Sequence, residues 1–300
     1  MNQPNTILFL VNPFAGIGNA PNAAKYAINI MQQNGYDTEL LVSKDLGDLS
    51  KFPLLFKLEK ICKIAVVGGD GTMFEVINAI MQNQQWLKIP IVAFPCGTGN
   101  SFNHDIDCLS VKKATILLLN GKVKLLDLAE VKTNGKTYWS FNSVGCGMVA
   151  NTNKLAEKLR WLGSYRYIIA SLLAIISKTT IKAKVTFNDQ VYNKEFSLML
   201  ACNSRFGGKA MIVAPFAKLN DGLIDFVILK KASRFRLFML LPKVFNGRHI
   251  KSPLIKLAQT NHIKIETEIP QLLNIDGEVL GNTSFEIIMF HQKLNVICEL

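Results

Sequence analysis

A glycine-rich segment at residues 66–75 combines residue types that suit phosphate binding. Its sequence, Val-Val-Gly-Gly-Asp-Gly-Thr-Met-Phe-Glu, reads as a buried strand that ends in glycines and restarts as a helix near Thr72. Glycines let backbone N–H groups approach an anion, and the helix N-terminus adds a positive dipole end. Asp70 would repel a bare phosphate, so we interpret it as a handle for Mg²⁺, directly or through water. The alternative is an ordinary strand-to-helix turn with Thr72 as N-cap.

Two further loops of similar composition follow strand-like runs. They are Asn12-Pro13-Phe14-Ala15-Gly16 and Pro95-Cys96-Gly97-Thr98-Gly99-Asn100. Loops at the carboxyl ends of parallel strands converge in one crevice, where ligands bind. A nucleotide fits three such loops, although neither common nucleotide motif is present. Pro21 interrupts a Rossmann fingerprint that would begin at Gly16, and Gly208-Lys209 lacks the Walker A spacing.

The elements that must position these loops alternate along the first part of the chain. Such alternation predicts a doubly wound parallel-sheet nucleotide-binding α/β domain over residues 1–125. We expect strands at Ile7–Val11, Glu39–Val42, Lys63–Val67 and Ile91–Phe94, and helices at Asn22–Gln33, Phe52–Ile61, Thr72–Gln82 and Val111–Leu119.

The remainder of the chain has a different texture, with short β-type segments separated by turns. This pattern predicts an antiparallel β-sandwich domain over residues 126–300, with a cleft between the two domains. We expect its strands at Lys124–Val131, Thr137–Val144, Ala183–Phe187, Phe196–Ala201, Leu223–Leu229, His262–Thr267, Ser284–Ile288 and Leu294–Glu299. Apolar spacings of three and four predict helical inserts at Asn153–Ser177 and Ser233–Val244.

The ordered set of motifs resembles the diacylglycerol kinase catalytic-domain family, which includes bacterial lipid kinases and sphingosine and ceramide kinases. The motifs that carry the resemblance are Asn12-Pro13, Gly68-Gly69-Asp70-Gly71-Thr72, Pro95-x-Gly97-Thr98-Gly99-Asn100, Asn203-x4-Gly208, Asn220-Asp221-Gly222 and Asp276-Gly277-Glu278. Gly-Gly-Asp-Gly alone is shared with NAD kinases and phosphofructokinases. The resemblance implies an ATP-binding domain, a β-sandwich lipid-substrate domain, and transfer of the γ-phosphoryl group of ATP to a lipid hydroxyl of the diacylglycerol or sphingoid type.

Site residues follow from the resemblance position by position. It implies that Glu278 is the general base and that Asp70 takes part in catalysis. The residues implied to contact ATP are Asn12, Ser43, Gly68, Gly69, Asp70, Gly71, Thr72, Met73, Phe74, Gly97, Thr98 and Asn100. Without the other motifs, a glutamate after a turn, such as Glu278, can equally be a solvated surface residue. The match at Ser43 is weak.

The resemblance also implies metal ligands. Asp276 would share a Mg²⁺ with Asp70, and Asp221 would hold a second, structural Mg²⁺ with the main-chain oxygens of Lys218 and Leu223. An Asn-Asp-Gly turn between strands explains Asp221 equally well. Many family members carry a Lys or Arg after the first glycine loop, where this chain has Gly18-Asn19-Ala20; Lys209 or Arg205 can supply the charge instead.

Charge is unevenly distributed along the chain. Residues 1–130 hold 11 Lys/Arg and 11 Asp/Glu, so the whole net charge of +12 belongs to residues 131–300. Such a field favours anionic partners, either a membrane surface or nucleic acid, although dispersed lysines are often only a solvated face. Because no aromatic-basic recognition motif is present, we expect no specific nucleic-acid partner. The six cysteines show no Cys-x-x-Cys pair, which favours buried free thiols.

No apolar run is long enough to span a bilayer, and the N-terminus lacks the basic region of a signal peptide. We therefore expect a cytoplasmic protein with peripheral membrane contact. Trp161 to Ile176, and Phe235 to Phe245 with the basic residues around it, can form an amphipathic entrance on an anionic leaflet. Helices packed on the sandwich would have the same pattern.

Alternative functions remain at this point. The chain can be an NAD kinase-like enzyme, since it shares Gly-Gly-Asp-Gly-Thr with that family. It can also be a non-catalytic lipid-binding regulatory protein of the same fold. A homodimer is possible, and neither the acceptor lipid nor an activating lipid can be read from residue spacing.

Overall fold

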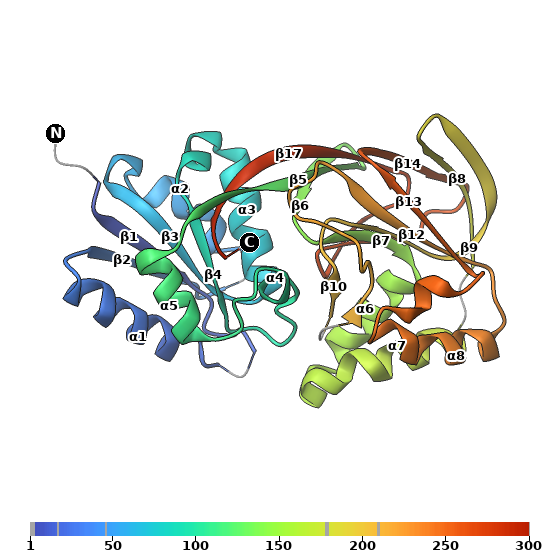
Figure 1. Ribbon diagram of the computed structural model, residues 1–300, viewed down its shortest axis with the longest axis horizontal. Helices are drawn as coiled ribbons and strands as arrows, with labels where there is room; N and C mark the ends of the chain where they lie inside the picture. The colour runs from blue at the N-terminus through green and yellow to red at the C-terminus, as the bar shows by residue number, and fades with distance from the viewer. Residues whose placement is uncertain (1–3, 17, 46, 178–179, 209–210, 300) are drawn as a thin grey trace. The chain divides into compact units, whose positions relative to one another are not determined.

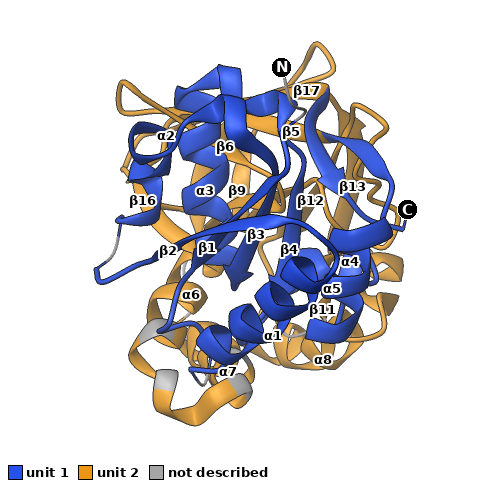
Figure 2. Ribbon diagram, turned by 90° about the vertical axis from the view of Figure 1, so that its left-hand side faces the viewer, with its two compact units in different colours: residues 1–126, 292–300 blue, residues 127–291 orange. Residues whose placement is uncertain are grey.

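The computed structural model describes residues 4–16, 18–45, 47–177, 180–208 and 211–299. Within it the chain forms two compact units, residues 1–126 with 292–300 and residues 127–291, which Figure 2 shows in different colours. The mixed architecture is the predicted one, with a parallel sheet in the first unit and antiparallel strands in the second.

Unit 1 is built on a parallel sheet in the order β2-β1-β3-β4. Its strands are β1 (Thr6–Val11), β2 (Asp37–Val42), β3 (Ile61–Gly68) and β4 (Ile91–Pro95). Helices α1 (Ala20–Gln33) and α5 (Val111–Asn120) cover one face, and α2 (Phe52–Leu55) and α3 (Asp70–Gln82) cover the other (Figure 1). The remaining elements are η1 (Leu49–Lys51), η2 (Leu58–Lys60), η3 (Gln84–Lys88) and α4 (Ser101–Asp105).

Burial explains why these segments form this sheet. All six residues of β1 are buried, as a central strand covered on both faces requires. In α1 the buried residues recur at three and four, which places them on one face against the sheet: Ala20, Ala23, Ala24, Ala27 and Met31. In register, Val11 of β1 lies beside Val42 of β2 and Val67 of β3, so the strands end at the same level.

One helix of this unit was predicted wrongly. The expected helix Phe52–Ile61 is only the single turn α2, because Phe56 adopts an extended backbone with φ −118° and ψ 147°. The chain then makes the short η2 and enters β3 already at Ile61. Apolar spacing alone could not separate a short turn from a longer helix here.

Residues 292–300 belong to unit 1, although the sequence suggested that they continue the second domain. Val296 of β17 (Phe285–Ile297) pairs in parallel with Ile91 of β4. Asn295 donates a side-chain hydrogen bond to Leu87 O (2.9 Å), and Cys298 N donates to Lys122 O (3.2 Å). These contacts join residues far apart in the sequence, so no local sequence pattern predicts them.

Unit 2 consists mainly of antiparallel strands. The strands are the second part of β5 (Val123–Thr133), β6 (Lys136–Ser140), β7 (Ser143–Gly147), β8 (Ile181–Phe187), β9 (Gln190–Cys202), β10 (Phe206–Gly207), β11 (Met211–Ile212), β12 (Ile224–Lys230), β13 (Ile255–Thr260), β14 (His262–Thr267), β15 (Leu272–Ile275), β16 (Glu278–Asn282) and the first part of β17. The long strand β9 pairs along one edge with β8 and then β7, and along the other with β12. The expected single strand Thr137–Val144 is two strands, β6 and β7.

A layer of helices packs on this unit. It contains α6 (Met148–Lys158), η4 (Arg160–Tyr165), α7 (Arg166–Ser177) and α8 (Arg234–Val244), followed by η5 (Arg248–Lys251). The expected helix Asn153–Ser177 is interrupted at Gly163, whose φ of 56° and ψ of −133° are not helical. The helix predicted at Ser233–Val244 is α8, and Ser233 caps it by accepting a hydrogen bond from Arg236 N. Among the described residues, no helix is long and apolar enough to cross a bilayer.

Candidate functional site

Three loops meet at the carboxyl edge of the parallel sheet in unit 1. They follow β1, β3 and β4, and backbone hydrogen bonds tie the first residues of the loops after β1 and β4 to the neighbouring strand β3. Asn12 N donates to Val67 O (3.0 Å) and Cys96 N donates to Gly68 O (2.8 Å). The order β2-β1-β3-β4 reverses direction at β1, so these loops flank a topological switch point, where open α/β sheets bind ligands.

The first loop contacts the other two. The side-chain amide of Asn12 donates to Thr72 Oγ1 (3.1 Å), while its Oδ1 accepts from Phe14 N (3.0 Å). Gly16 has a φ of 59°, and a Cβ added there would lie 2.4 Å from Cys96 O. A glycine is therefore required at Gly16 for the first loop to lie against the third.

The second and third loops pack backbone against backbone. A Cβ on Gly97 would lie 2.5 Å from Gly69 Cα and 2.7 Å from Asn100 Oδ1. Asn100 adopts a left-handed backbone (φ 49°), accepts from Gly97 N (2.8 Å) and donates to Gly97 O (2.9 Å). Glycine at both positions thus allows main chain from two loops to gather at one place.

Asp70 joins the same two loops through its side chain. Its Oδ2 accepts from Ser101 N (2.9 Å) and its Oδ1 from Phe102 N (3.2 Å), so the carboxylate caps the N-terminus of α4. A carboxylate that accepts backbone N–H groups at a helix start satisfies donors that the helix itself leaves open. Asp70 therefore holds the third loop in place, a role that the sequence did not reveal.

The other residues expected to contact ATP differ in how far their side chains are buried. Thr72, Met73 and Phe74 in the first turn of α3 are buried, and the Met73 N–H already donates to Gly69 O (3.1 Å). Gly97, Thr98 and Asn100 are half-buried and lie on the third loop. The structure thus brings the expected residues of all three loops together in unit 1, and the α3 N-terminus adds a positive dipole end.

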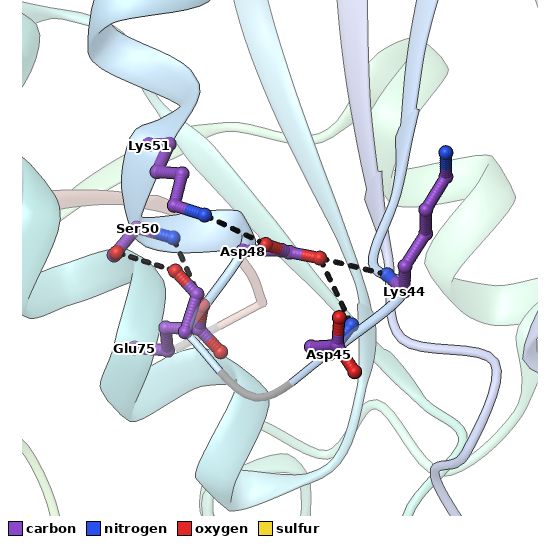
Figure 3. Close-up of polar contacts among 7 residues, drawn as sticks. Lys44, Asp45, Asp48, Ser50, Lys51 and Glu75 are labelled. Carbon is purple, nitrogen blue, oxygen red and sulfur yellow. Dashed lines mark hydrogen bonds and ion pairs between the residues drawn. The ribbon is translucent and has the colours of Figure 1, made fainter.

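Ser43 begins a fourth connection, which is fastened to α3 by a glutamate (Figure 3). Ser43 is buried and its N–H donates to Val11 O (2.9 Å), so it directly follows β2 at the same edge of the sheet. Farther along the segment, Ser50 N donates to Glu75 Oε1 (2.9 Å), and Asp48 accepts from the N–H groups of Lys44 and Asp45. Burial raises the pKa of Glu75 above its usual value, with the backbone donors acting in the opposite direction. Glu75 was not singled out in the sequence.

In unit 2, Glu278 directly follows a two-residue hairpin turn. Asp276 (φ 52°) and Gly277 (φ 102°) form the turn between β15 and β16, and Ile275 pairs with Glu278 across it. Both left-handed residues suit the tight turn that an Asp-Gly pair predicts. The Glu278 side chain is exposed at the first position of β16.

Asp276 does not fit the metal-ligand role that the resemblance implied. Its buried carboxylate accepts four hydrogen bonds from one segment, from Ser140 Oγ (2.6 Å), Phe141 N (2.9 Å), Asn142 N (2.9 Å) and Ser143 N (2.8 Å). Burial raises the pKa of Asp276 to about 6, although these donors act in the opposite direction. A shell of N–H and O–H donors stabilises an anion and repels a cation, so Asp276 anchors the hairpin to the start of β7.

The loop that carries Asp221 is held by a different carboxylate. Leu223 N donates to Asp221 Oδ1 (3.1 Å), which forms the local turn that was the alternative explanation for this motif. Gly222 N donates to Asp127 Oδ2 (2.7 Å), and His291 Nδ1 lies 2.9 Å from Asp127 Oδ1. Asp127 and His291 are 164 positions apart, so sequence motifs did not associate them.

No group of three or more His, Cys, Asp or Glu side chains that could hold a metal ion occurs in the described part of the chain. The main-chain oxygens expected to complete an Asp221 site belong to Lys218 and Leu223, which lie in the same loop before β12. Of the two basic residues considered as phosphate contacts, Lys209 lies outside the described residues. Arg205 is half-buried, with its guanidinium 5.1 Å from the centre of the Phe206 ring.

Comparison with known proteins agrees with the motifs. Residues 6–131 match the model of the diacylglycerol kinase catalytic domain, and residues 142–298 match the YegS C-terminal NAD kinase beta sandwich-like domain. The chain belongs to the diacylglycerol kinase catalytic-domain family. It is therefore a member of a family of lipid kinases.

Individual relatives of this lipid kinase family cover nearly the whole chain. A diacylglycerol kinase of Bacillus subtilis (strain 168) is 26% identical over 96% of this chain and 94% of the relative. Sphingosine kinase 1 of Arabidopsis thaliana is 23% identical over 99% of this chain and 74% of the relative. A crystal structure of a diacylglycerol kinase from Bacillus anthracis str. Sterne shares the fold, with a TM-score of 0.74 and 23% identity over 100% of this chain and 98% of that chain.

Proposed function

We propose that this protein is an ATP-dependent lipid kinase whose acceptor is a hydroxyl of a diacylglycerol or sphingoid lipid. The observation that carries the proposal is the meeting of the three glycine loops at the switch point of the parallel sheet. The close approach of Gly69 and Gly97 concentrates backbone there, which suits a triphosphate better than a small neutral ligand. Relatives named diacylglycerol kinase and sphingosine kinase support a lipid acceptor.

The residues of unit 1 hold the nucleotide in this proposal. Backbone N–H groups of residues 69–72 and 98–99 are the proposed phosphate donors, because Gly97 N already donates to Asn100 Oδ1 and Met73 N to Gly69 O. Asn12 and Asp70 keep the loops in position. Ser43 supplies a further nucleotide contact beside the first loop. Phosphoryl transfer depends mainly on such positioning and on charge stabilisation, with little covalent chemistry for the protein to perform.

Glu278 is the proposed general base. The lipid oxygen bonds to the γ-phosphorus, the bond from that phosphorus to the ADP oxygen breaks, and the hydroxyl proton passes to the Glu278 carboxylate. Its place on a hairpin that Asp276 anchors by four hydrogen bonds gives the base a defined backbone position. Rigid support of this kind suits a group that must meet one proton.

Mg²⁺ is proposed to enter with ATP, bound to its phosphate oxygens. Asp70 is the proposed carboxylate handle for this Mg²⁺, and the four donors around Asp276 argue against a cation at that second carboxylate. Chelation with EDTA should abolish turnover, and added Mg²⁺ should restore it.

A second Mg²⁺ is proposed at Asp221 with the carbonyls of Lys218 and Leu223. If it binds there, Mg²⁺ should raise the melting temperature of the wild type and not that of Asp221→Asn.

A labelled-phosphate assay tests the activity. Purified protein is incubated with γ-labelled ATP, Mg²⁺ and mixed micelles of diacylglycerol, monoacylglycerol, sphingosine, ceramide or phosphatidylglycerol, and the products are identified by mass spectrometry. Glu278→Gln should lower turnover by at least about 10²-fold while ATP affinity stays nearly unchanged. Glu268→Gln, at an exposed glutamate in the same unit, is the matched control and should retain full turnover.

Two other outcomes would replace the proposal. NAD belongs in the acceptor panel because the matched C-terminal domain is described as NAD kinase beta sandwich-like. Phosphorylation of NAD and of none of the lipids would indicate an NAD kinase-like enzyme. Lipid binding without phosphoryl transfer to any acceptor would indicate a non-catalytic lipid-binding protein of the same fold.

A further inference from the structure

Helices α7 and α8 of unit 2 leave apolar side chains exposed on their outer sides. The two helices lie together in the same layer, as Figure 1 shows, and share one buried cluster. Ala174 and Ile175 of α7 meet Leu237 and Leu240 of α8 in that cluster. Arg234 Nε also donates to Ile176 O at the end of α7 (2.8 Å), which fixes the start of α8 against it. The pair is therefore one surface element.

The exposed apolar residues follow helical spacing. On α8 they are Phe235, Phe238 and Met239, at i, i+3 and i+4, opposite the buried Leu237 and Leu240. On α7 they are Ile168, Leu172, Leu173 and Ile176, and on η4 Trp161 and Tyr165. We name these nine residues the apolar face. Phe235 is 74% exposed and Trp161 79% exposed, which are unusual values for large apolar side chains in water.

The two chain segments that carry the apolar face are strongly basic. Residues 226–265, which include α8, hold nine Lys or Arg and no Asp or Glu. Residues 158–188, which include η4 and α7, hold six Lys or Arg and again no Asp or Glu. On α8 itself, Arg236 and Lys243 are exposed beside the apolar residues. Lys231, just before α8, pairs with Glu195, and the remaining excess of cations in these segments is large. An apolar stripe on a strongly basic part of the chain complements the interface of a bilayer that contains anionic lipids.

We propose that the apolar face of η4, α7 and α8 docks the protein onto the surface of an anionic bilayer, with the side chains of Phe235 and Met239 entering the headgroup region. The inference rests on the proposed function, because an enzyme that phosphorylates a membrane lipid must reach it at the membrane. A second copy of the chain would be a poorer occupant. Two faces that both carry an excess of cations would repel each other across a symmetric dimer interface.

Vesicle flotation with the full chain tests the docking surface without ATP and without an acceptor. Vesicles contain either phosphatidylcholine alone or phosphatidylcholine with roughly one third phosphatidylglycerol. The wild type should bind the anionic vesicles at least tenfold more tightly, and binding should weaken as salt is raised from about 0.1 M to about 0.5 M. Phe235→Ser/Met239→Ser should lower binding at least tenfold. Arg236→Gln/Lys243→Gln should reduce binding to the anionic vesicles more than to the neutral ones.

Ile269→Ser is the matched control, because Ile269 is 71% exposed in unit 2 and lies outside the apolar face. It should bind vesicles like the wild type. All variants replace exposed side chains, and unchanged thermal unfolding shows that each is folded. Equal vesicle binding by the wild type and the Phe235/Met239 variant would overturn the proposal. A second result would also overturn it: the wild type is a dimer in analytical ultracentrifugation, the Phe235/Met239 variant is a monomer, and neither protein binds vesicles.

The docking and the proposed reaction fail in distinguishable ways. Vesicle binding by Glu278→Gln should equal that of the wild type, because docking needs no catalysis. The Phe235/Met239 variant should still phosphorylate an acceptor dispersed in detergent micelles, while its turnover on bilayer vesicles falls at least tenfold. Loss of activity in micelles together with normal vesicle binding would count against the reaction and leave the docking surface standing.

Discussion

The Asp70 carboxylate accepts a hydrogen bond of 2.9 Å from the backbone N–H of Ser101, 31 positions later in the chain. The glycine loop after β3 therefore positions the start of α4 and, with it, the loop that contains Gly97 and Asn100. A motif that reads as a phosphate site in the sequence is thus also a brace between two loops.

Asp70→Ala should loosen that brace. Loss of an N-terminal cap costs about 1 kcal/mol, and here two backbone donors lose their acceptor. We expect faster hydrogen exchange at residues 101–102 and weaker ATP binding, measured by mass spectrometry and by titration. Asp70→Asn, which keeps one acceptor oxygen, should show a smaller change in exchange. Equal protection at these amides in Asp70→Ala and the wild type would contradict the brace.

Gly97→Ala should be more harmful than an alanine at an open glycine. The new methyl group would lie 2.5 Å from Gly69 Cα, so two backbones must separate. Gly35→Ala is the matched control, because Gly35 has a φ of 84° with open space around it. An alanine there should lower the free energy of unfolding by only about 1–2 kcal/mol through backbone strain. Denaturant unfolding should show a larger loss for Gly97→Ala, together with loss of ATP binding. A Gly97→Ala protein as stable as Gly35→Ala would argue against the close approach of the loops.

Asp276→Asn should destabilise the protein at pH 7. The amide group of Asn presents its own donors to the four donors that now surround the carboxylate, and unsatisfied buried donors cost about 1–3 kcal/mol each. Asp189→Asn is the control, because Asp189 is an exposed turn residue with a similar φ of 56°. Asn tolerates a positive φ, so the backbone effects of the two substitutions cancel. Urea unfolding of both variants at pH 7 measures the difference.

The same carboxylate predicts a component of the pH dependence. Its pKa is raised from 3.8 to about 6 in the fold, so the folded state binds the proton more tightly than the unfolded state. This stabilising contribution is complete below pH 3.8 and is lost as the pH rises through about 6. Unfolding curves between pH 4 and pH 7 should show this component in the wild type and not in Asp276→Asn. Parallel pH profiles for the two proteins would disprove it.

His249 predicts a component of opposite sign. It is buried, its Nε2 lies 3.0 Å from Val213 O, and burial lowers its pKa below the usual 6.5. The folded state therefore favours neutral imidazole, so stability is complete above pH 6.5 and is lost as the pH falls through the lowered pKa. His249→Gln should flatten the acid side of the stability profile relative to the wild type. Thermal unfolding between pH 5 and pH 8 provides the measurement.

The sequence predicted the parts of the fold and site that depend on local composition. The loops at residues 12–16, 68–72 and 95–100 do follow β1, β3 and β4, because glycine and the start of a helix are properties of neighbouring residues. The parallel and antiparallel halves followed from hydrophobic periodicity in the same way. The roles of the individual site residues in catalysis stay predictions.

Contacts between distant segments could not be predicted from composition. Nothing near Asp70 indicates that Ser101 is its partner, and nothing near Asp127 indicates His291. The resemblance implied a metal-ligand role for Asp276, and its donors come from residues 140–143, more than a hundred positions earlier, so no local pattern indicates them. The expected helix Phe52–Ile61 failed in a different way, because the local apolar pattern is helical but the structure does not follow it. The helix ends at Leu55, and Ile61 is the first residue of β3.

Strand β17 determines the order in which the two units can mature during synthesis. Its first part belongs to unit 2, and its last part completes unit 1 by pairing Val296 with Ile91. Unit 2 is therefore an insertion within unit 1. A ribosome makes all of residues 127–291 before residues 292–300, which include the partner of β4, emerge. A fragment that stops at residue 126 would expose that edge, which makes it prone to aggregate.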